Sequence, residues 1–434
     1  MQHSSDNAAQ PNELNESPEI SESHIRTKYG PKTDQPAGSF NHISDIEREV
    51  FADFAGWDKS VAPAASEKKE NIEIPRQRFC TITDIHGNPK AFIHSLEEAG
   101  LARINDDLSF QLTKEGLKTP IIISGDSIDR GPQSLRVLDI MMHLKRQGAH
   151  INALAGDHEI MALLALDSVS METKEPHFLK LLNKLTPQVS PSSPTPIENL
   201  DKLLKEEARK KEHQDHQLAL YDAGAFLQWY VRGGHALLEE ITHKYFGNRS
   251  NVKFNDILKK ANELFGINGV YGNFLREMPL FGQIDDILLI HAGLDDTWAQ
   301  ILETKGIEGA NDYYHDIMNN GNYDFLVNGP LAEAVWKRGH EISPYAAKVL
   351  KGLGISTIVR GHDRMRDGIQ KHYAVNGINI INNDTGILHT GKGGTIIHPD
   401  GSIKCFSAHS AKEQRTLFKL PAYTRPQNRK EIAA

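Results

Sequence analysis

The stretch 121–131, Ile-Ile-Ile-Ser-Gly-Asp-Ser-Ile-Asp-Arg-Gly, constrains the fold most, because an apolar run stops at a glycine and two acids. Three consecutive isoleucines are β-branched and apolar on both faces, which is typical of a buried parallel strand. In open α/β sheets, ligands lie beyond the carboxyl ends of the strands. We therefore expect Asp126 and Asp129 to lie where chemistry is usually placed, and with Arg130 beside them they indicate metal and phosphate.

The overall composition limits the class of protein. A chain of 434 residues allows one large α/β domain or two smaller ones. Its net charge of -8 argues against a nucleic-acid partner, because that affinity comes mainly from lysine and arginine. No apolar run approaches membrane-spanning length, and the first residues lack the pattern of a signal peptide. We expect a cytoplasmic protein without a membrane span, although the acidic composition and polar tails also suit a bacterial effector delivered into a host-cell cytosol.

The two cysteines, Cys80 and Cys405, are far apart in the sequence and give no disulfide framework. Neither fits a cysteine-based phosphatase. That chemistry needs an arginine in the loop after the nucleophile, and the corresponding positions hold His86 and Ala411.

The chain divides by composition into a layered α/β domain and its appendages. Residues 1–45 are polar and poor in large apolar side chains, which predicts a disordered tail. A short helix and a linker are expected over 46–75, and the domain itself over 76–406. The segment 167–265 is predicted to be an inserted helical hairpin with its turn near Ser190, and 407–434 a C-terminal tail. We interpret the hairpin as a solvated surface insertion, with a partner-recruiting arm as the alternative.

Strand-like runs alternate with helix-like runs, which predicts a layered sheet. Asn88 and Pro89 predict the start of one helix, and Pro132 the start of another. Five strand-like runs end in acids or histidines, and we expect these to meet at one edge of the sheet. These residues are Asp84, His86, Asp126, Asp129, Asp157, His158, His291 and His362.

This set of side chains favours a metal site. Asp84 and His86 are two positions apart, so in an extended segment both point to one side. Carboxylate and imidazole together suit manganese, iron or zinc, whereas calcium and magnesium prefer oxygen ligands. A single histidine in an apolar strand is more often a core residue, but five strand ends carrying such groups are not explained in that way.

Five sequence blocks resemble those of the calcineurin-like metallophosphoesterases, closest to bacterial-type members of the phosphoprotein phosphatase branch. In sequence order, these blocks are Asp84-x-His86-Gly87, Gly125-Asp126-x-x-Asp129-Arg130-Gly131, Gly156-Asp157-His158-Glu159, His291-Ala292-Gly293-Leu294 and Arg360-Gly361-His362-Asp363. The order and the spacing of the blocks both fit this family. The resemblance extends over about 78 to 390, apart from the helical insertion. The resemblance implies a β-sandwich of mixed sheets flanked by helices, with a dinuclear site at the sheet edge.

The resemblance also implies the metal ligands and the cofactor. The first metal would be held by Asp84, His86 and Asp126. The second would be held by Asp126, Asp157, His291 and His362, so that Asp126 bridges the two. Two divalent transition-metal ions are expected, manganese first, with iron or zinc as alternatives.

The implied reaction is in-line attack on phosphorus by a metal-bridging hydroxide. His158 would protonate the leaving oxygen, with Asp129 orienting its ring. Arg130 would bind the phosphate as a planar pair of donors. Arg338 is the preferred second arginine, and Arg360 is interpreted as structural.

The third block departs from the family, because Asp157 stands where an asparagine is usual. An aspartate can still ligate a metal, but it adds a negative charge. We hypothesise that the bridging water is then less acidic and the activity optimum lies at higher pH, so that Asp157→Asn would move the acidic limb to lower pH. The alternative is a neutral exchange.

Three functions remain open from the sequence. The leading one is a metal-dependent phosphoprotein phosphatase acting on phosphotyrosine alongside phosphoserine and phosphothreonine, with the 167–265 hairpin as a site for a protein partner. The second is a dinucleoside polyphosphate hydrolase, because relatives with that activity carry a tryptophan and a Gly-Gly pair like those in 229–234. The third is a binding scaffold with an inactive site.

Overall fold

The computed structural model describes residues 76–104, 110–168, 225–226, 228–247, 252, 254–320, 326, 331–365, 370–407 and 415–421. All of them belong to the compact unit Val61–Ala434. The predicted N-terminal tail, the helix and linker of 46–75, and residues 169–224 of the predicted hairpin lie outside the described residues.

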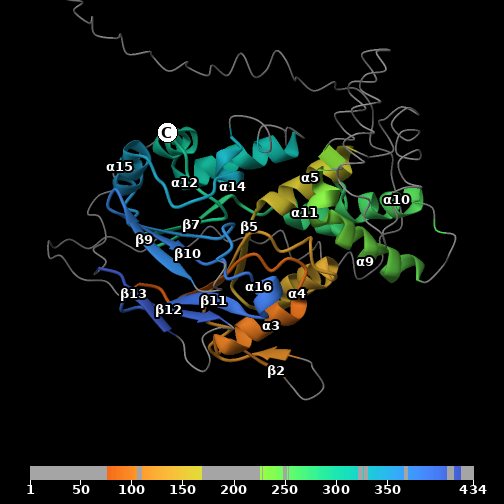
Figure 1. The fold of residues 1–434 in the computed structure, drawn as a ribbon, viewed down its shortest axis with the longest axis horizontal. Helices are drawn as coiled ribbons and strands as arrows, with labels where there is room; N and C mark the ends of the chain where they lie inside the picture. The colour runs from red at the N-terminus through yellow and green to blue at the C-terminus, as the bar shows by residue number, and fades with distance from the viewer. Residues whose placement is uncertain are drawn as a thin grey trace, which may run out of the picture. The chain divides into compact units, whose positions relative to one another are not determined.

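One mixed sheet has six strands in the order β13-β12-β11-β1-β4-β5 (Figure 1). The strands are β1 (Phe79–Ile82), β4 (Ile121–Ser124), β5 (Ile151–Leu154), β11 (Gly393–Ile397), β12 (Ser402–Ser407) and β13 (Arg415–Lys419). β1, β4 and β5 are parallel, and the other three pair antiparallel. β4 lies between β1 and β5 and is buried throughout, which explains why its isoleucines do not alternate with polar residues.

A second mixed sheet has five strands in the order β6-β7-β8-β10-β9. The strands are β6 (Phe281–Ile284), β7 (Ile287–Ile290), β8 (Thr357–Arg360), β9 (Lys371–Val375) and β10 (Ile378–Asn382). β7, β8 and β10 are parallel, so each sheet has a parallel centre whose carboxyl ends can carry a site. The short strands β2 (Ala102–Ile104) and β3 (Phe110–Leu112) form a separate hairpin.

The two sheets share one hydrophobic core. Phe79, Ile122 and Leu154 from the six-stranded sheet belong to the same buried cluster as Ile287 and Val359 from the five-stranded sheet. Helices cover the outer faces (Figure 1): α3 (Pro89–Glu98), α4 (Ser134–Arg146) and α16 (Ile387–Thr390) on the first sheet, and α12 (Asp296–Asn319) and α15 (Pro344–Gly352) on the second. The predicted α/β layering of mixed sheets flanked by helices is confirmed.

The helix starts agree with the sequence in one case and differ in the other. The Asn88 side chain caps α3 and Pro89 occupies its first turn, as predicted. α4 begins at Ser134 instead of Pro132. A residue from outside the segment caps this start, because the Glu240 carboxylate accepts two backbone N–H groups of the first turn at 2.8 and 3.3 Å.

The residues that follow the undescribed part of the insertion are packed against the domain. α5 (Asp157–Ser168) extends into the predicted insertion, and α9 (His235–Phe246), α10 (Phe254–Phe265) and α11 (Val270–Arg276) follow it. α9 contacts α4, and α10 contacts α5. The buried apolar side chains of α9 and α10 include Leu237, Leu238, Ile241, Ile257, Leu258, Ala261 and Phe265. The prediction of a solvated insertion is therefore wrong for α9 and α10, because each helix buries an apolar face.

The predicted C-terminal tail also differs, since 415–419 form the edge strand β13. Phe418 packs against the shared core and stacks on His372 of β9 with ring centroids 3.9 Å apart. Leu420 is buried as well. These apolar residues attach the segment to both sheets.

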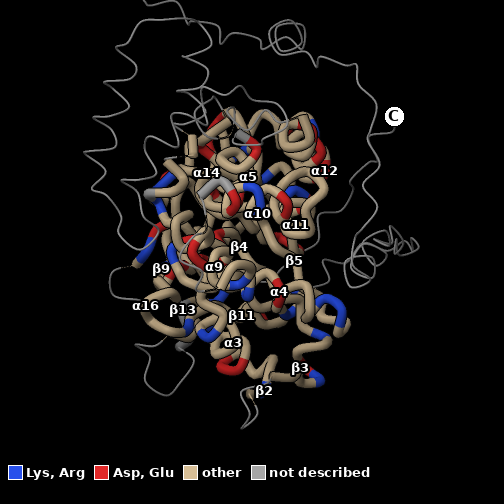
Figure 2. The backbone as a smooth tube through the Cα atoms, turned by 90° about the vertical axis from the view of Figure 1, so that its right-hand side faces the viewer, with Lys and Arg blue, Asp and Glu red and all other residues tan. Residues whose placement is uncertain are grey.

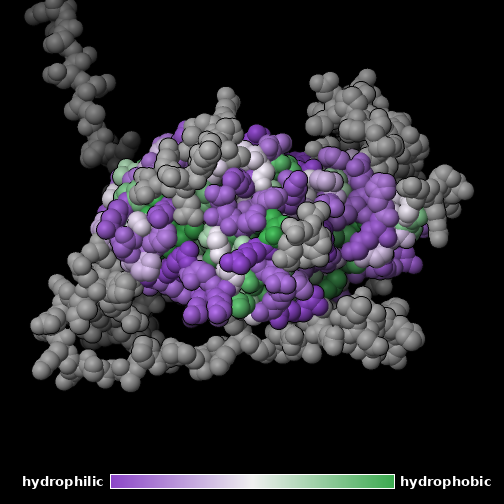
Figure 3. All heavy atoms as spheres, turned by 90° about the horizontal axis from the view of Figure 1, so that it is seen from below, coloured by the Kyte–Doolittle hydropathy of each residue, from purple (hydrophilic) through white to green (hydrophobic). Residues whose placement is uncertain are grey.

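The surface of the described part is mainly polar. Lysines and arginines are interspersed with acids in the view of Figure 2, and hydrophobic side chains form small separate patches in the view of Figure 3. In the part of the chain that the structure describes, no helix is long and apolar enough to cross a membrane.

Two further short helices lie in the described part of the chain. They are the α-helix α14 (Glu333–Trp336) and the π-helix η2 (Tyr230–Gly234).

Candidate metal centre

The strand ends of both sheets bring metal-ligating side chains together. Ligand atoms of Asp126, Asp157, His291 and His362 lie within 4.8 Å of one another, and all four residues are buried. A second buried group, equally close, consists of His86, Asp126 and His158. Asp126 belongs to both groups. The four-residue group is the set expected for the second metal.

Asp84 joins the second group through His86. The Asp84 Oδ1 atom lies 3.8 Å from His86 Nε2, and Asp126 Oδ2 lies 3.6 Å from the same nitrogen. The other Asp84 oxygen accepts hydrogen bonds from the His362 backbone N–H at 3.1 Å and from the Thr83 hydroxyl at 2.6 Å. The three residues expected to hold the first metal are thus adjacent, and the Asp84 carboxylate is fixed in orientation.

Backbone carbonyl groups orient two of the imidazoles. The Nδ1 atom of His291 lies 2.8 Å from the Ser124 carbonyl oxygen, and Nδ1 of His86 lies 3.2 Å from that of Ile128. An N–H at Nδ1 that donates to a carbonyl leaves Nε2 as the ligand atom. In both residues Nε2 faces the ligand cluster.

Asp157 lies at the centre of the four-residue group. Its Oδ1 atom is 3.0 Å from His291 Nε2 and 3.1 Å from His362 Nδ1. Although burial raises the pKa of Asp157, the imidazoles of His158, His291 and His362 lower it well below its usual value. These imidazoles therefore favour the charged form of the carboxylate, which is the form that can ligate a metal.

Unsatisfied buried atoms show that the group fits cations. Among the described residues, Asp126 Oδ2, His158 Nε2 and His362 Nε2 are buried and have no hydrogen-bond partner. Such atoms are uncommon in folded proteins and call for an explanation. Burial and the charge of Asp157 raise the pKa of Asp126 well above its usual value, which is the effect of two carboxylates sharing one small space. Positive charge would relieve both features, and this mixture of carboxylate and imidazole suits divalent transition-metal ions.

The backbone of the centre is unusual. Eight described non-glycine residues have a positive φ. Six of them belong to the site, namely Asp84, His86, Asp126, Asp129, Arg130 and His362. L-amino acids rarely adopt this left-handed conformation, and such strain is concentrated at functional sites.

Two glycines of the sequence blocks are required by close approach. A Cβ atom on Gly156 would lie 2.4 Å from Asp126 Oδ1, and one on Gly361 would lie 2.4 Å from Asp84 Oδ2. These distances are far shorter than van der Waals contact. Any side chain at either position would displace a ligand.

His158, Asp129 and Trp229 form a hydrogen-bonded chain beside the ligands. His158 Nδ1 lies 2.9 Å from Asp129 Oδ2, and the Trp229 indole N–H donates to the same oxygen at 2.8 Å. Burial lowers the pKa of His158, but the carboxylates of Asp126, Asp157 and Asp129 together raise it to about 9. The imidazole of His158 thus lies beside the candidate ligands His86 and Asp126. Trp229 was not predicted to contact Asp129.

Glu159 is a second residue whose role was missed. Its buried carboxylate accepts backbone N–H groups from Gly156 at 2.9 Å, Asp126 at 2.9 Å and Ser127 at 2.7 Å. One side chain therefore joins the loops after β4 and β5. Glu159 is the last residue of the third sequence block, and only this position in the block indicated that it could have a role.

The arginines differ in their surroundings. Arg130 Nη1 lies 2.6 Å from His86 Nε2, and its backbone N–H donates to Gly233 at 3.1 Å. Arg338 has a side chain that is 61% exposed and donates to the His362 carbonyl at 3.1 Å. Arg360 is buried and pairs with Asp363 at 2.8 Å. Arg130 and Arg338 thus adjoin the ligands, while Arg360 is occupied within the protein.

No protein-family model matches the sequence, and no curated protein is significantly similar to it. Similar solved structures include a cold-active protein-tyrosine phosphatase from a psychrophilic Shewanella species, at 17% identity over 79% of this chain and 81% of that chain, with a TM-score of 0.45. A serine/threonine phosphatase from Saccharomyces cerevisiae matches at 14% identity over 80% and 81%, with a TM-score of 0.37. A metallophosphoesterase from Sphaerobacter thermophilus matches at 10% identity over 76% and 88%, with a TM-score of 0.32. Because these similarities are remote, we infer the function from the geometry of the centre.

Proposed function

We propose that this chain is a metal-dependent phosphomonoester hydrolase acting on phosphoproteins. The observation that carries the proposal is the pair of buried ligand groups sharing Asp126, with the partnerless Nε2 atom of His158 beside them. A shared carboxylate suits two cations, which we expect to be manganese, with iron or zinc as alternatives.

The residues divide between the two cations. Asp84, His86 and Asp126 would hold one, and the group of Asp126, Asp157, His291 and His362 would hold the other. When bound, the two cations would lower the pKa of a water molecule and withdraw charge from the phosphoryl oxygens. Burial of the ligands excludes bulk water and strengthens these interactions.

The chain itself would bind the phosphate and deliver a proton. Arg130 and Arg338 adjoin the ligands from different loops, and a guanidinium can donate two parallel hydrogen bonds to a phosphoryl group. His158 would protonate the leaving oxygen from Nε2, because Nδ1 is held by Asp129. Trp229 keeps Asp129 in place for this role.

Features at the rim of the centre support a phosphorylated side chain, with phosphotyrosine accepted alongside phosphoserine and phosphothreonine. Trp336 lies beside His362, with ring centroids 6.4 Å apart, and the guanidinium of Arg232 lies 4.7 Å from the Trp336 ring centroid. An aromatic residue next to the ligands offers a surface for an aryl phosphate.

The full chain supplied with manganese provides the test. We expect hydrolysis of p-nitrophenyl phosphate and of matched phosphotyrosine and phosphothreonine peptides, together with bound transition metal measured on the same sample. Asp126→Asn is the control, and it should lose both. Cleavage of diadenosine tetraphosphate without phosphopeptide hydrolysis would favour the dinucleotide reading, whereas no bound metal and no hydrolysis would favour a binding scaffold.

A further inference from the structure

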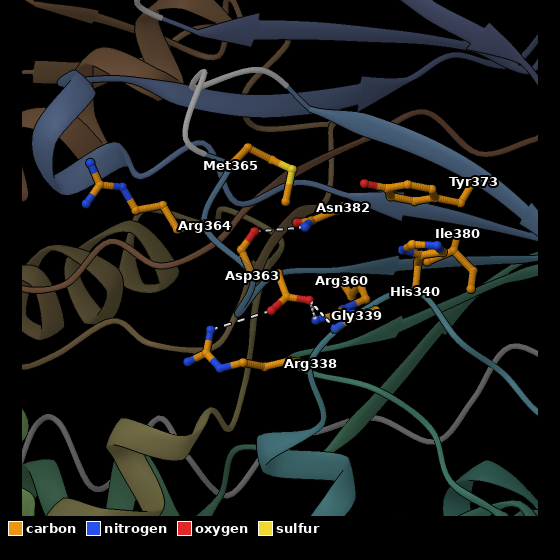
Figure 4. Close-up of a pocket in the computed structure, with 10 residues that line it drawn as sticks. All are labelled: Arg338, Gly339, His340, Arg360, Asp363, Arg364, Met365, Tyr373, Ile380 and Asn382. Atoms are coloured by element: carbon orange, nitrogen blue, oxygen red, sulfur yellow. Dashed lines mark hydrogen bonds and ion pairs between the residues drawn. The ribbon is translucent and has the colours of Figure 1, made fainter.

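A cavity of about 380 Å³ adjoins the metal centre (Figure 4). Its size is within the range of ligand-binding pockets. The segment 360–365, which contains the candidate ligand His362, contributes four residues to its lining. The cavity is lined by Arg338, Gly339, His340, Arg360, Asp363, Arg364, Met365, Tyr373, Ile380 and Asn382.

The lining has a surplus of positive charge. It contains three arginines and one aspartate, a net charge of +2 with histidine neutral, whereas the whole chain carries -8. Asp363 is already engaged by Arg360 at 2.8 Å and by the Gly339 backbone N–H at 2.5 Å. The charges of Arg338 and Arg364 therefore remain without a matching carboxylate in the lining, apart from a 3.5 Å contact between Arg338 and Asp363.

Arg364 is exposed, and it makes no hydrogen bond or ion pair with any residue that the structure describes. In Figure 4 its guanidinium lies on the same side of Asp363 as that of Arg338. The Arg364 side chain packs against Gly386, where a Cβ atom would lie 2.7 Å from Arg364 Nε.

The opposite wall is apolar and aromatic. His340 and Tyr373 stack with ring centroids 4.0 Å apart and an interplanar angle of 4°. Met365 and Ile380 also line the cavity, and Figure 4 shows the two rings on the side of Asp363 away from the guanidinium groups of Arg338 and Arg364. A cavity with cations at one side and an apolar wall at the other fits a side chain with an aliphatic stem and an anionic end.

We propose that this cavity is a subsite for a second anionic group of a phosphopeptide substrate, a carboxylate or a phosphate carried close to the phosphorylated residue. The subsite rests on the proposed function, because the reacting phosphate must lie at the metal centre. Its role is to select acidic or multiply phosphorylated segments through Arg364.

The test compares three phosphopeptides of one sequence that differ only near the phosphorylated residue, with alanine, glutamate or a second phosphoserine at one to three positions after it. We expect kcat/KM to be about fivefold higher for at least one anionic peptide, the upper range for an exposed ion pair. Arg364→Gln should abolish this preference while p-nitrophenyl phosphate hydrolysis stays unchanged, and Arg364→Lys should retain most of it. The preference should also decrease with added salt.

Arg103→Gln is the matched control, because Arg103 is an exposed arginine on β2. It should leave the preference intact. Equal kcat/KM for all three peptides, or a preference that survives in Arg364→Gln, would overturn the subsite alone. Failure of the wild type to hydrolyse any peptide or p-nitrophenyl phosphate would overturn the proposed function and the subsite with it. A response to glutamate but not to phosphoserine, or the reverse, identifies which anion the subsite takes.

Discussion

The metal centre and the arginine-lined cavity are neighbours, but they are constructed differently. In the centre, His86 and His291 are buried and each is oriented by a backbone carbonyl, and Asp84 is held by two hydrogen bonds. In the cavity, Arg338 is 61% exposed, and Arg364 is exposed as well. Fixed groups suit chemistry, which requires preorganised charge, and exposed groups can adapt to different substrates. Under the two proposals, the centre would carry out the reaction and Arg364 in the cavity would select the substrate, while Arg338 would adjoin both regions.

The largest effect should come from Asp126→Asn, which tests whether the centre depends on one shared carboxylate. Because Asp126 belongs to both ligand groups, we expect loss of bound metal and a fall in kcat of at least about 1,000-fold. Asp129→Asn should keep the metal and lower mainly the rate. Metal analysis by mass spectrometry, with steady-state kinetics on p-nitrophenyl phosphate, measures both. Equal metal loss in the two variants would contradict the division of roles.

A smaller effect is expected from His158→Asn, which removes the proton donor but not an assigned ligand. General acid catalysis contributes about 100- to 10,000-fold, so kcat should fall within that range at unchanged metal content. The decrease in kcat should be smaller for p-nitrophenyl phosphate than for a phosphothreonine peptide, because the nitrophenolate leaving group needs little protonation. A loss of metal in this variant would instead make His158 a ligand.

Trp229→Phe tests how far the supporting residues matter. It removes the indole hydrogen bond to Asp129 while keeping a buried aromatic ring. One hydrogen bond contributes about 1 kcal/mol, so we expect about a fivefold lower kcat with KM unchanged. Circular dichroism and the thermal midpoint verify that the variant is folded. An unchanged kcat would show that Asp129 is held without Trp229.

The smallest effect concerns Glu240, outside both regions. Burial raises its pKa from 4.5 to about 7, against the hydrogen bonds from Leu135 and Arg136 that lower it. Between these two values the folded chain keeps a proton that the unfolded chain has lost, so this group's stabilisation is lost as pH rises through about 7. Glu240→Gln should flatten that part of the stability profile, measured by urea unfolding at about pH 5 and about pH 8. Activity should not change, and a parallel profile for wild type and variant would refute the shift.

The candidate ligands could be located from the sequence because each lies within about four positions of the end of a strand. The chemistry of Asp84, His86 and Asp126 is local to the strand ends, and parallel strands bring such ends to one edge. The supporting contacts were not predictable in this way. Trp229 reaches Asp129 from 100 positions away, and Glu159 binds backbone groups of two loops. Neither contact produces a periodic pattern.

The misjudged segments have a common physical cause. In α9 and α10, charged residues occupy one face of the helix and buried apolar residues the other, so the average composition of the segment did not reveal the apolar face. In 415–419, a short strand is attached by Phe418 and by pairing with β12, which depends on a partner strand distant in the fold. Local composition predicts solvation well only where tertiary contacts do not override it.

The left-handed backbone of the centre has a consequence for how such a chain can change over generations. Each non-glycine residue in that conformation costs about 1 kcal/mol, and six of them form one site. Domains of this kind are only marginally stable, so this cost is a considerable fraction of the total. Selection for a durable fold and selection for catalysis therefore oppose each other at these positions. In a descendant that is not selected for catalysis, replacing these residues by glycine or asparagine would increase stability. The ligands would therefore be lost before the sheets that carry them.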